Sequence, residues 1–372
     1  MRLRGRSSVG RASASQAEGR RFETGRPLLK TSLSVVIVAW NSAEYLARTL
    51  PALASELLPG DEVIIVDNDS SDDLELVVAT HLPAATILAM GGNVGYTSAV
   101  NHGAAVAVGN LLVVLNPDAM PEPGFGAAIR RPATDGSSWA AWMALVVCHE
   151  GGRRVVNSNG NPVHFTGFSW AGGHGSEVPV ATGPRTLPAA ASGACLAVPL
   201  ESWDRIGGFS SDFFLYQEDT DLSLRIRSGG EQIGIVGDAV VDHDYDFGRS
   251  GQKWLWLERN RWAMIIRNYP AALIAGLAPA LVATELALIP VAARGGWLPQ
   301  KLAAWGQVIR WLPRLLGERR RIQSVRTLSA RHFAALLTPD LDSPFFPGFV
   351  RSPVVRFVLR TYWRLVKGFL PG

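Results

Sequence analysis

The chain has 372 residues, 47% of them hydrophobic, which is enough to bury a sizeable core in about two domains. The net charge is +4, but the first 30 residues carry eight Lys or Arg against two Glu, so the remainder is slightly acidic. This balance argues against nucleic acid as a partner. Two cysteines, Cys148 and Cys195, cannot form a disulfide framework, so we expect a reducing compartment and two structural thiols.

Residues 1–30 differ in composition from the rest of the chain. They are rich in Arg and Ser and contain no apolar stretch of the kind found in a secretory signal. We expect a disordered or spurious extension and leave it out of the fold prediction.

From residue 33 to residue 120, short apolar strands alternate four times with helical segments. The strand-like segments are LSVVIVAW (33–40), DEVIIVDNDSSD (61–72), TILAM (86–90) and NLLVVLNPDA (110–119). The helical segments between them are AEYLARTLPAL, ELVVATHL and the second part of GGNVGYTSAVNHGAAVAVG. This alternation predicts βαβ units and an α/β fold with a mainly parallel sheet.

Each of these strands is followed by polar residues. They are Asn41, then Asp67, Asn68 and Asp69, then Asn93, and finally Asn116 and Asp118. Ligands of open α/β sheets bind outside the carboxyl ends of the strands. A single Asp after a strand is usually a turn residue, but four polar strand ends in succession favour a binding cleft.

The second half of the chain is less regular. We expect irregular loops and short antiparallel strands over 121–190, and a strand–turn–strand in EQIGIVGDAVVDHD (231–244). KWLWLERNRWAMIIRNY (253–269) has the spacing of an amphipathic helix.

Residues 271–293 form an apolar run with one charge, Glu285, and two prolines, Pro279 and Pro290. The run is long enough to cross a bilayer, but the prolines and the charge favour a broken, re-entrant or interfacial element. The Arg-rich amphipathic tract that follows favours an anionic membrane surface as a partner. The alternative is a pair of buried helices with a solvated basic face.

The ordered segments over residues 33–265 resemble the family 2 glycosyltransferases, and more narrowly their rhamnosyltransferase-like branch. The segments that carry the resemblance are VVIVAWNSAEYL, VIIVDNDSSD, NVGYTSAVNHGA, VVLNPDA, ASGACLAV, GGFSSDFFLYQEDTDLSLR and DHDYDFGRS. The resemblance implies a Rossmann-like GT-A fold with a hydrophobic, helical C-terminal extension. It divides the chain into a nucleotide-binding half (31–120), an acceptor half (121–268) and a membrane-associating region (269–372).

The resemblance also implies a nucleotide-sugar donor and assigns residues to it. Asp67 would accept a hydrogen bond from the pyrimidine N3–H, and the backbone around Gly95 would approach the nucleotide closely. The full set assigned to the nucleotide-sugar is Ala39, Trp40, Asn41, Glu44, Asp67, Asn93, Gly95, Asn116, Asp118 and Arg261.

A divalent cation, Mg²⁺ or Mn²⁺, is implied by the family's Asp-x-Asp motif, which is Asn116-Pro117-Asp118 in this sequence. Asp118 would be the main protein ligand, since one carboxylate with phosphate oxygens and water suffices for Mg²⁺. His243 would be a second ligand or a phosphate contact. Its alternative is a surface histidine among acidic neighbours.

The carboxylates at 218–221 match the family's Glu-Asp motif. Inversion needs one general base for the acceptor hydroxyl, and we assign Asp219 to that task and Glu218 to positioning. Asp221 would pair with Arg225 four residues later on a helix, although LSLRIR alternates like a strand. The alternative is a helix N-terminus with solvated carboxylates.

Residues 258–262 read ERNRW, which is similar to the Gln-x-x-Arg-Trp motif of processive synthases but has Glu258 in place of Gln. This departure argues against processive synthesis. Arg261 would contact the diphosphate, or else Arg259 and Arg261 would lie exposed on a surface helix.

The sequence therefore predicts a glycosyltransferase that moves one sugar, for example rhamnose from dTDP-rhamnose, to a lipid-linked or cell-wall glycan acceptor. It would act at the cytoplasmic face of the cell membrane. The alternative is a catalytically silent, membrane-associated sugar-binding protein on the same fold. A dinucleotide-dependent oxidoreductase is disfavoured because WNSAEY, after the first strand, has no Gly-x-Gly-x-x-Gly turn.

Overall fold

The computed structural model describes residues 31–179, 183–187, 189–244, 252–344 and 346–372. The predicted extension at 1–30 lies outside the described residues, as do residues 245–251 of the motif around His243. Thr31 to Gly372 belong to one compact unit. The boundary that we drew at residue 268 stays a prediction.

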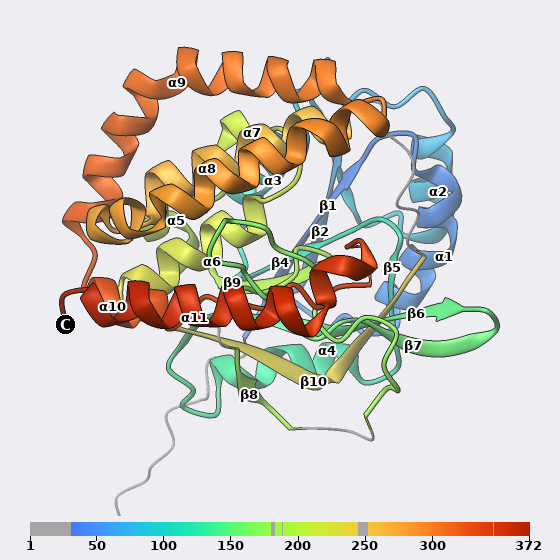
Figure 1. The fold of residues 1–372 in the computed structure, drawn as a ribbon. Helices are drawn as coiled ribbons and strands as arrows, with labels where there is room; N and C mark the ends of the chain where they lie inside the picture. The colour runs from blue at the N-terminus through green and yellow to red at the C-terminus, as the bar shows by residue number, and fades with distance from the viewer. Residues whose placement is uncertain (1–30, 180–182, 188, 245–251, 345) are drawn as a thin grey trace, which may run out of the picture. The chain divides into compact units, whose positions relative to one another are not determined.

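The first half of the sheet consists of parallel strands in the order β3-β2-β1-β4. Strands β1, β2 and β4 are labelled in Figure 1. Its strands are β1 (Leu33–Ala39), β2 (Glu62–Asp67), β3 (Thr86–Ala89) and β4 (Leu111–Leu115). The helices are α1 (Ala43–Ala54), α2 (Leu74–His81) and α3 (Tyr96–Val106). Every residue of β1 and β4 is buried, as expected of apolar, β-branched runs covered on both faces. The predicted alternation of strands and helices is confirmed.

The second half extends this sheet through β9, β6, β10 and β5, with both parallel and antiparallel pairs. The strands are β5 (Ala119–Pro121), β6 (Trp139–Glu150), β7 (Arg153–Ser158), β8 (Arg185–Thr186), β9 (Cys195–Pro199) and β10 (Gln232–His243). The helices are α4 (Phe125–Arg130), α5 (Leu200–Ile206) and α6 (Glu218–Ser228), with short 3₁₀ turns at Arg131–Ala133 and Ser211–Phe213. The result is an α/β fold of the GT-A type on a mixed sheet.

Two expectations for this half were wrong. The region 121–190 contains β6, a 12-residue strand in the middle of the sheet, where we expected only short strands. The segment 231–244 is one strand, β10, and the predicted turn is a register shift between Val236 and Val240 against β6. A bulge of this kind re-aims a strand without ending it.

Helices make up most of the C-terminal part. They are α7 (Lys253–Asn268), α8 (Ala271–Arg294), α9 (Leu298–Ser324), α10 (Ala330–Ala334) and α11 (Pro353–Phe369), with a 3₁₀ turn at Gly348–Arg351. A second apolar core joins them to the acceptor half, where Phe165 stacks on Trp363 of α11 at 5.0 Å between ring centroids.

Helix α8 runs unbroken through Pro279 and Pro290, so the broken element that we expected is not formed. Among the described residues it is the one helix long and apolar enough to cross a membrane, with a mean hydropathy of 2.0 in its most apolar window. Only 17% of that window is buried.

Three buried charges and the half-buried Glu285 join α7, α8 and α9. Arg261 of α7 pairs with Glu258 of its own helix and with Glu285 of α8. Lys301 of α9 lies 2.6 Å from Glu258 and 2.8 Å from Glu285. Arg261 is 1% exposed, and Arg259 is buried as well, so the alternative that both lie on a surface helix is wrong.

Candidate active site

The carboxyl ends of the parallel strands bring the predicted nucleotide residues to one edge of the sheet. Ala39 and Asp67 are neighbours in the β1–β2 register, and the Asn68 amide donates to the Ala39 carbonyl at 2.8 Å. Asn41 has a positive φ of 50° and accepts a hydrogen bond from the Ser71 amide at 2.8 Å. Sheet pairing and these loop bonds together fix the two strand ends relative to each other.

Two side chains at this edge remain available to a ligand. Trp40 is 56% exposed although it directly follows a fully buried strand. Asp67 is half-buried, and its Oδ1 accepts from the Ser70 amide at 2.9 Å, which leaves Oδ2 for a further donor. Glu44 is exposed in the first turn of α1 and lines an open groove with Asn41.

Asn93 and Gly95 lie in the loop that precedes α3. Asn93 Oδ1 accepts from Asn68 Nδ2 and from the Gly95 amide, both at 3.1 Å. Gly95 has a φ of 84°, and a Cβ added there would lie 2.5 Å from the ring of Phe214. Glycine is therefore required at this position, because the loop of the nucleotide-binding half packs directly against the acceptor half.

Tyr96, which sequence reasoning did not assign, lies where the two halves meet. Its hydroxyl is 3.3 Å from Oδ1 of Asn116. Burial, together with the nearby charges of Glu218, Asp219 and Asp118, raises the pKa of Tyr96 well above its usual value. Tyr96 therefore marks the point at which the predicted metal motif and the predicted base come together.

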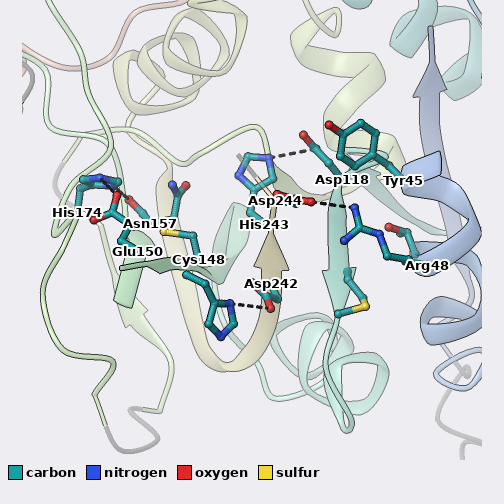
Figure 2. Close-up of a pocket in the computed structure, with 13 residues that line it drawn as sticks. Tyr45, Arg48, Asp118, Cys148, Glu150, Asn157, His174, Asp242, His243 and Asp244 are labelled. Carbon is teal, nitrogen blue, oxygen red and sulfur yellow. Dashed lines mark hydrogen bonds and ion pairs between the residues drawn. The ribbon is translucent and has the colours of Figure 1, made fainter. Parts of the chain in front are cut away.

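Asp118 and His243 lie in a pocket of about 290 Å³. Figure 2 shows Tyr45 and Arg48 of α1 on one side of this pocket and Cys148, Glu150 and His174 on the other. His243 Nε2 lies 3.1 Å from Asp118 Oδ1, and the Asp244 amide donates to the Asp118 carbonyl at 2.9 Å.

The Asp118–His243 pair fits a divalent cation by chemistry and placement. A carboxylate and an imidazole converge from β10 and from the loop after β4, and both line the pocket. Carboxylate and water suit Mg²⁺ or Mn²⁺, and an imidazole ligand is compatible with a transition metal. His243 is buried, so the alternative of a surface histidine is wrong.

Asp219 is fixed by hydrogen bonds from three segments. Its Oδ2 accepts from the Gly193 amide at 3.0 Å and from Asn161 Nδ2 at 3.2 Å, and its Oδ1 accepts from the Thr220 amide at 2.6 Å. Burial raises the pKa of Asp219. A carboxylate that is positioned and raised in pKa in this way is suited to general-base catalysis.

Glu218, the neighbour of Asp219, is buried, and its Oε2 has no hydrogen-bond partner among the described residues. Burial and the Asp219 charge raise the pKa of Glu218 to about 8. The raised pKa favours the protonated form of Glu218, because two adjacent buried carboxylates oppose each other's ionisation. The alternative of solvated carboxylates at a helix N-terminus is wrong.

Asp221 has the structural role that we expected. It pairs with Arg225 at 2.9 Å on α6, and Asn268 donates to its other oxygen at 2.8 Å. Burial opposes ionisation, but the Arg267 and Arg225 charges lower the pKa of Asp221. The helix predicted over LSLRIR is confirmed.

The loop before Glu218 has a strained backbone and is held in place by a side chain of helix α7. Phe214, Tyr216 and Gln217 all have positive φ, a conformation that costs on the order of 1–3 kcal/mol for each non-glycine residue. Asn260 of α7 donates through Nδ2 to the carbonyl oxygens of Phe213, Leu215 and Tyr216 at 2.8–2.9 Å. We assign Asn260 as a positioning residue for the carboxylate pair.

Arg261, which we expected to contact the diphosphate, is already bound to other groups of the protein. Its guanidinium binds Glu258, Glu285 and the Thr166 carbonyl oxygen. A contact with diphosphate would require these interactions to break.

Sequence reasoning missed Tyr96, Asn161, Gly193 and Asn260. Tyr96 and Gly193 lie within motifs that carried the resemblance, but only the fold shows what they contact. Asn161 gave no signal in the sequence, and Asn260 lies within ERNRW but received no role, because each contacts a group 44 to 58 positions away in the chain.

Comparisons with known proteins bear on the family and on the fold. The family model described as "Glycosyl transferase family 2" matches residues 34–163. The chain is 27% identical over 241 residues to the N-acetylglucosaminyl-diphospho-decaprenol L-rhamnosyltransferase of Mycobacterium tuberculosis strain H37Rv, covering 57% of this chain and 75% of that enzyme.

Among solved structures, GalNAc-T7 with UDP, GalNAc and Mn²⁺ matches with a TM-score of 0.54 at 16% identity, over 68% of this chain and 51% of that one. The chain thus spans about half of that structure. Staphylococcus aureus TarS 1–349 in complex with UDP-GlcNAc matches with a TM-score of 0.50 at 14% identity, over 91% of this chain and 90% of that one. At these identities the matches establish the fold alone.

The chain therefore has a GT-A-like fold. Its residues 34–163 are similar to glycosyl transferase family 2, and the chain shows distant homology to a mycobacterial L-rhamnosyltransferase.

Proposed function

We propose that the protein is an inverting, metal-dependent glycosyltransferase that moves one rhamnose from dTDP-rhamnose to a lipid-linked or cell-wall glycan acceptor. The observation that carries this proposal is the link between the metal motif and the base: the Asn116 amide donates to the Ala194 carbonyl at 2.9 Å, and the adjacent Gly193 amide donates to Asp219 Oδ2 at 3.0 Å. The choice of sugar and of a lipid-linked acceptor follows the mycobacterial relative, which is a rhamnosyltransferase named for a diphospho-decaprenol compound.

The nucleotide-sugar donor would bind at the carboxyl ends of the parallel strands. The free oxygen of Asp67 would accept from N3–H of the pyrimidine, and the exposed ring of Trp40 would contact the base. Asn93 and the close-packed Gly95 would hold the loop that faces the nucleotide.

Asp118 and His243 would hold the cation, which supplies positive charge for the departing diphosphate. Tyr96 remains protonated because its pKa is raised, so its hydroxyl is a donor beside Asn116. Asp219 would take the proton of the acceptor hydroxyl while the oxygen attacks the anomeric carbon. As that bond forms, the bond to the diphosphate breaks, the diphosphate leaves with the electron pair, and the configuration at the carbon inverts.

We further propose that the protein lies on the cytoplasmic face of the membrane without crossing it. Crossing by α8 would carry Glu285 into hydrocarbon, whereas Glu285 is held by Arg261, Lys301 and Trp305. Large apolar side chains are instead exposed along three helices: Val282 and Leu286 on α8, Leu302, Ile309, Leu312 and Leu316 on α9, and Val354, Phe357, Val358, Leu365 and Phe369 on α11. Arg310, Arg314, Arg360 and Arg364 are exposed on α9 and α11, as binding to an anionic surface requires.

A thermal-shift panel of nucleotide-sugars with Mg²⁺ or Mn²⁺ tests the donor. We expect dTDP-rhamnose with the cation to raise the melting temperature most, because it binds only the folded state. Asp118→Asn should lose the dependence on the cation, while Asp204→Asn, at an exposed position of α5, should keep it. If dTDP-rhamnose gives no shift and another nucleotide-sugar does, the proposed sugar is wrong. If the shift occurs without turnover of any acceptor or of water, the silent sugar-binding alternative is favoured.

A further inference from the structure

The far wall of the pocket carries a second set of metal-ligating side chains. Cys148 and Glu150 are two residues apart on β6, so they project from the same face of the strand. His174 approaches them from the loop that follows β7 (Figure 2). A thiol, a carboxylate and an imidazole thus meet on the wall opposite Arg48.

The ligand atoms of these three residues all lie within 4.8 Å of one another. His174 Nε2 is 2.8 Å from Glu150 Oε1. Ligands bound to zinc at about 2.0–2.3 Å in a tetrahedron are roughly 3.5 Å apart, so no pair of ligand atoms has to close by more than about 1.3 Å, and Nε2 and Oε1 would move slightly apart. Glu150 is at the end of a hairpin and its side chain is 51% exposed, so it is free to supply most of that movement.

The orientation of His174 is that of a metal-binding histidine. Its Nδ1 lies 3.3 Å from the carbonyl oxygen of Asn157, which favours a proton on Nδ1. Nε2 lies 2.8 Å from Glu150 Oε1 and would release the proton shared there when it binds a metal. The loop is fixed on β7, because the Gly175 amide donates to Val156 at 2.9 Å and the Val156 amide to Ser176 at 2.9 Å. The imidazole is therefore held by backbone contacts that do not involve Glu150.

We propose that Cys148, Glu150 and His174 form a Zn²⁺ site on this wall. Zinc is the metal that this donor set selects, since it accepts thiolate, imidazole and carboxylate in one tetrahedral site with water at the fourth position. Asp118, by contrast, offers oxygen beside His243, so the two sites differ in ligand type although they line one pocket.

The consequence of zinc binding is a fixed pocket wall. The metal would link the end of β6 to the loop carrying His174, two segments joined in the described structure by hydrogen bonds through β7 and by the His174–Glu150 pair. The inference does not depend on the proposed function, because it concerns binding by residues outside the assigned nucleotide-sugar and base sets.

The test is equilibrium dialysis of the full-length, chelator-treated protein against ZnCl₂, with the metal content measured afterwards. We expect one zinc per chain, lost in Cys148→Ala and in His174→Ala. His149→Ala, one position along β6 and facing Asp242, should retain the metal, as should Cys195→Ala and Asp118→Asn. Equal zinc content in the wild type and in His174→Ala would overturn the proposal.

Cobalt gives a second readout that does not depend on activity. Co²⁺ bound through Cys148 should give a thiolate charge-transfer band that disappears in Cys148→Ala. Circular dichroism checks that each variant is folded. If a variant at a buried position does not fold, Glu150→Ala, at an exposed position, replaces it in the test. Zinc should also raise the melting temperature of the wild type but not that of Glu150→Ala or His174→Ala. Absence of the band in wild type, or an equal shift in these variants, contradicts a site at these residues.

Discussion

The side-chain amide of Asn260 lies 2.8 Å from the carbonyl oxygen of Tyr216, two residues before Glu218. Through this contact and two similar ones, helix α7 holds a loop whose backbone is strained at three non-glycine residues. The carboxylate pair therefore depends for its position on a residue that lies 44 places beyond Tyr216 in the chain.

Replacing Asn260 by Ala should lower kcat by about 100-fold, since a small misplacement of a reacting group has an effect of that order. The Kd of the donor should change little, because the nucleotide edge of the sheet does not contact α7 through this residue. Both kcat and the Kd of the donor are measured for the wild type and for the variant. Asn260→Asp retains the oxygen that Arg259 Nε contacts but loses the donor, so it should resemble Asn260→Ala. An Asn260→Asp variant as active as wild type would show that the amide donor is not needed.

Glu218 should make the free energy of unfolding fall as pH rises. Its pKa is about 8 in the folded protein and near 4.5 when unfolded, so between these values the folded state binds more protons. The stability is fully present below about pH 4.5 and is lost as pH rises through about 8. Denaturant titrations across this window should show a weaker decline in Glu218→Gln, while Glu75→Gln, at an exposed position of α2, should follow the wild type. Parallel curves for Glu218→Gln and wild type would contradict a protonated Glu218.

Trp40→Ala should raise the Kd of the nucleotide about 10-fold, because the exposed ring would lose its contact with the base. Calorimetric titration with the nucleoside diphosphate measures this directly. Trp254→Ala removes another exposed tryptophan, one that stacks on Trp297, and should leave the Kd unchanged. If Trp40→Ala and Trp254→Ala change the Kd of the nucleotide equally, Trp40 has no specific role in binding the base.

The exposed apolar face of α11 should bind anionic vesicles. The double variant Phe357→Glu and Phe369→Glu places two charges on this face and should reduce co-sedimentation with phosphatidylglycerol vesicles at least 10-fold. Leu76→Glu, at an exposed apolar position of α2, is the matched control and should sediment like wild type. Undiminished binding of the double variant would contradict an interfacial α11.

The strands β1, β2 and β4 could be predicted because each is a short apolar run followed at once by polar residues. Their carboxyl ends meet by the geometry of parallel sheets, which also brought Asn41 and Asp67 together. Local pattern and fold agree in this half of the chain.

The second half could not be read in the same way. Strand β6 is apolar on both faces within a region rich in Gly and Pro, so its length was not evident from periodicity. Helix α8 contains two prolines, yet its packing against α9 and α11 and the charges around Glu285 maintain one helix. Tertiary contacts overrode local propensity in both places.

The sequence predicted the charged members of the site but not the groups that orient them. Asp118, Asp219 and His243 were assigned through motifs, whereas Asn161 lies outside the motifs and Asn260 is a neutral amide within ERNRW to which the motif gives no role. Their roles arise from contacts between distant segments, which no local pattern records.

The most direct test of the central claim is sugar transfer by Asp219→Asn at saturating donor and cation. We predict a kcat at least 100-fold below wild type, because a general base contributes on the order of 10²–10⁴, with the donor Kd unchanged. Asp204→Asn should turn over normally. Wild-type kcat in Asp219→Asn would contradict the assignment of the base.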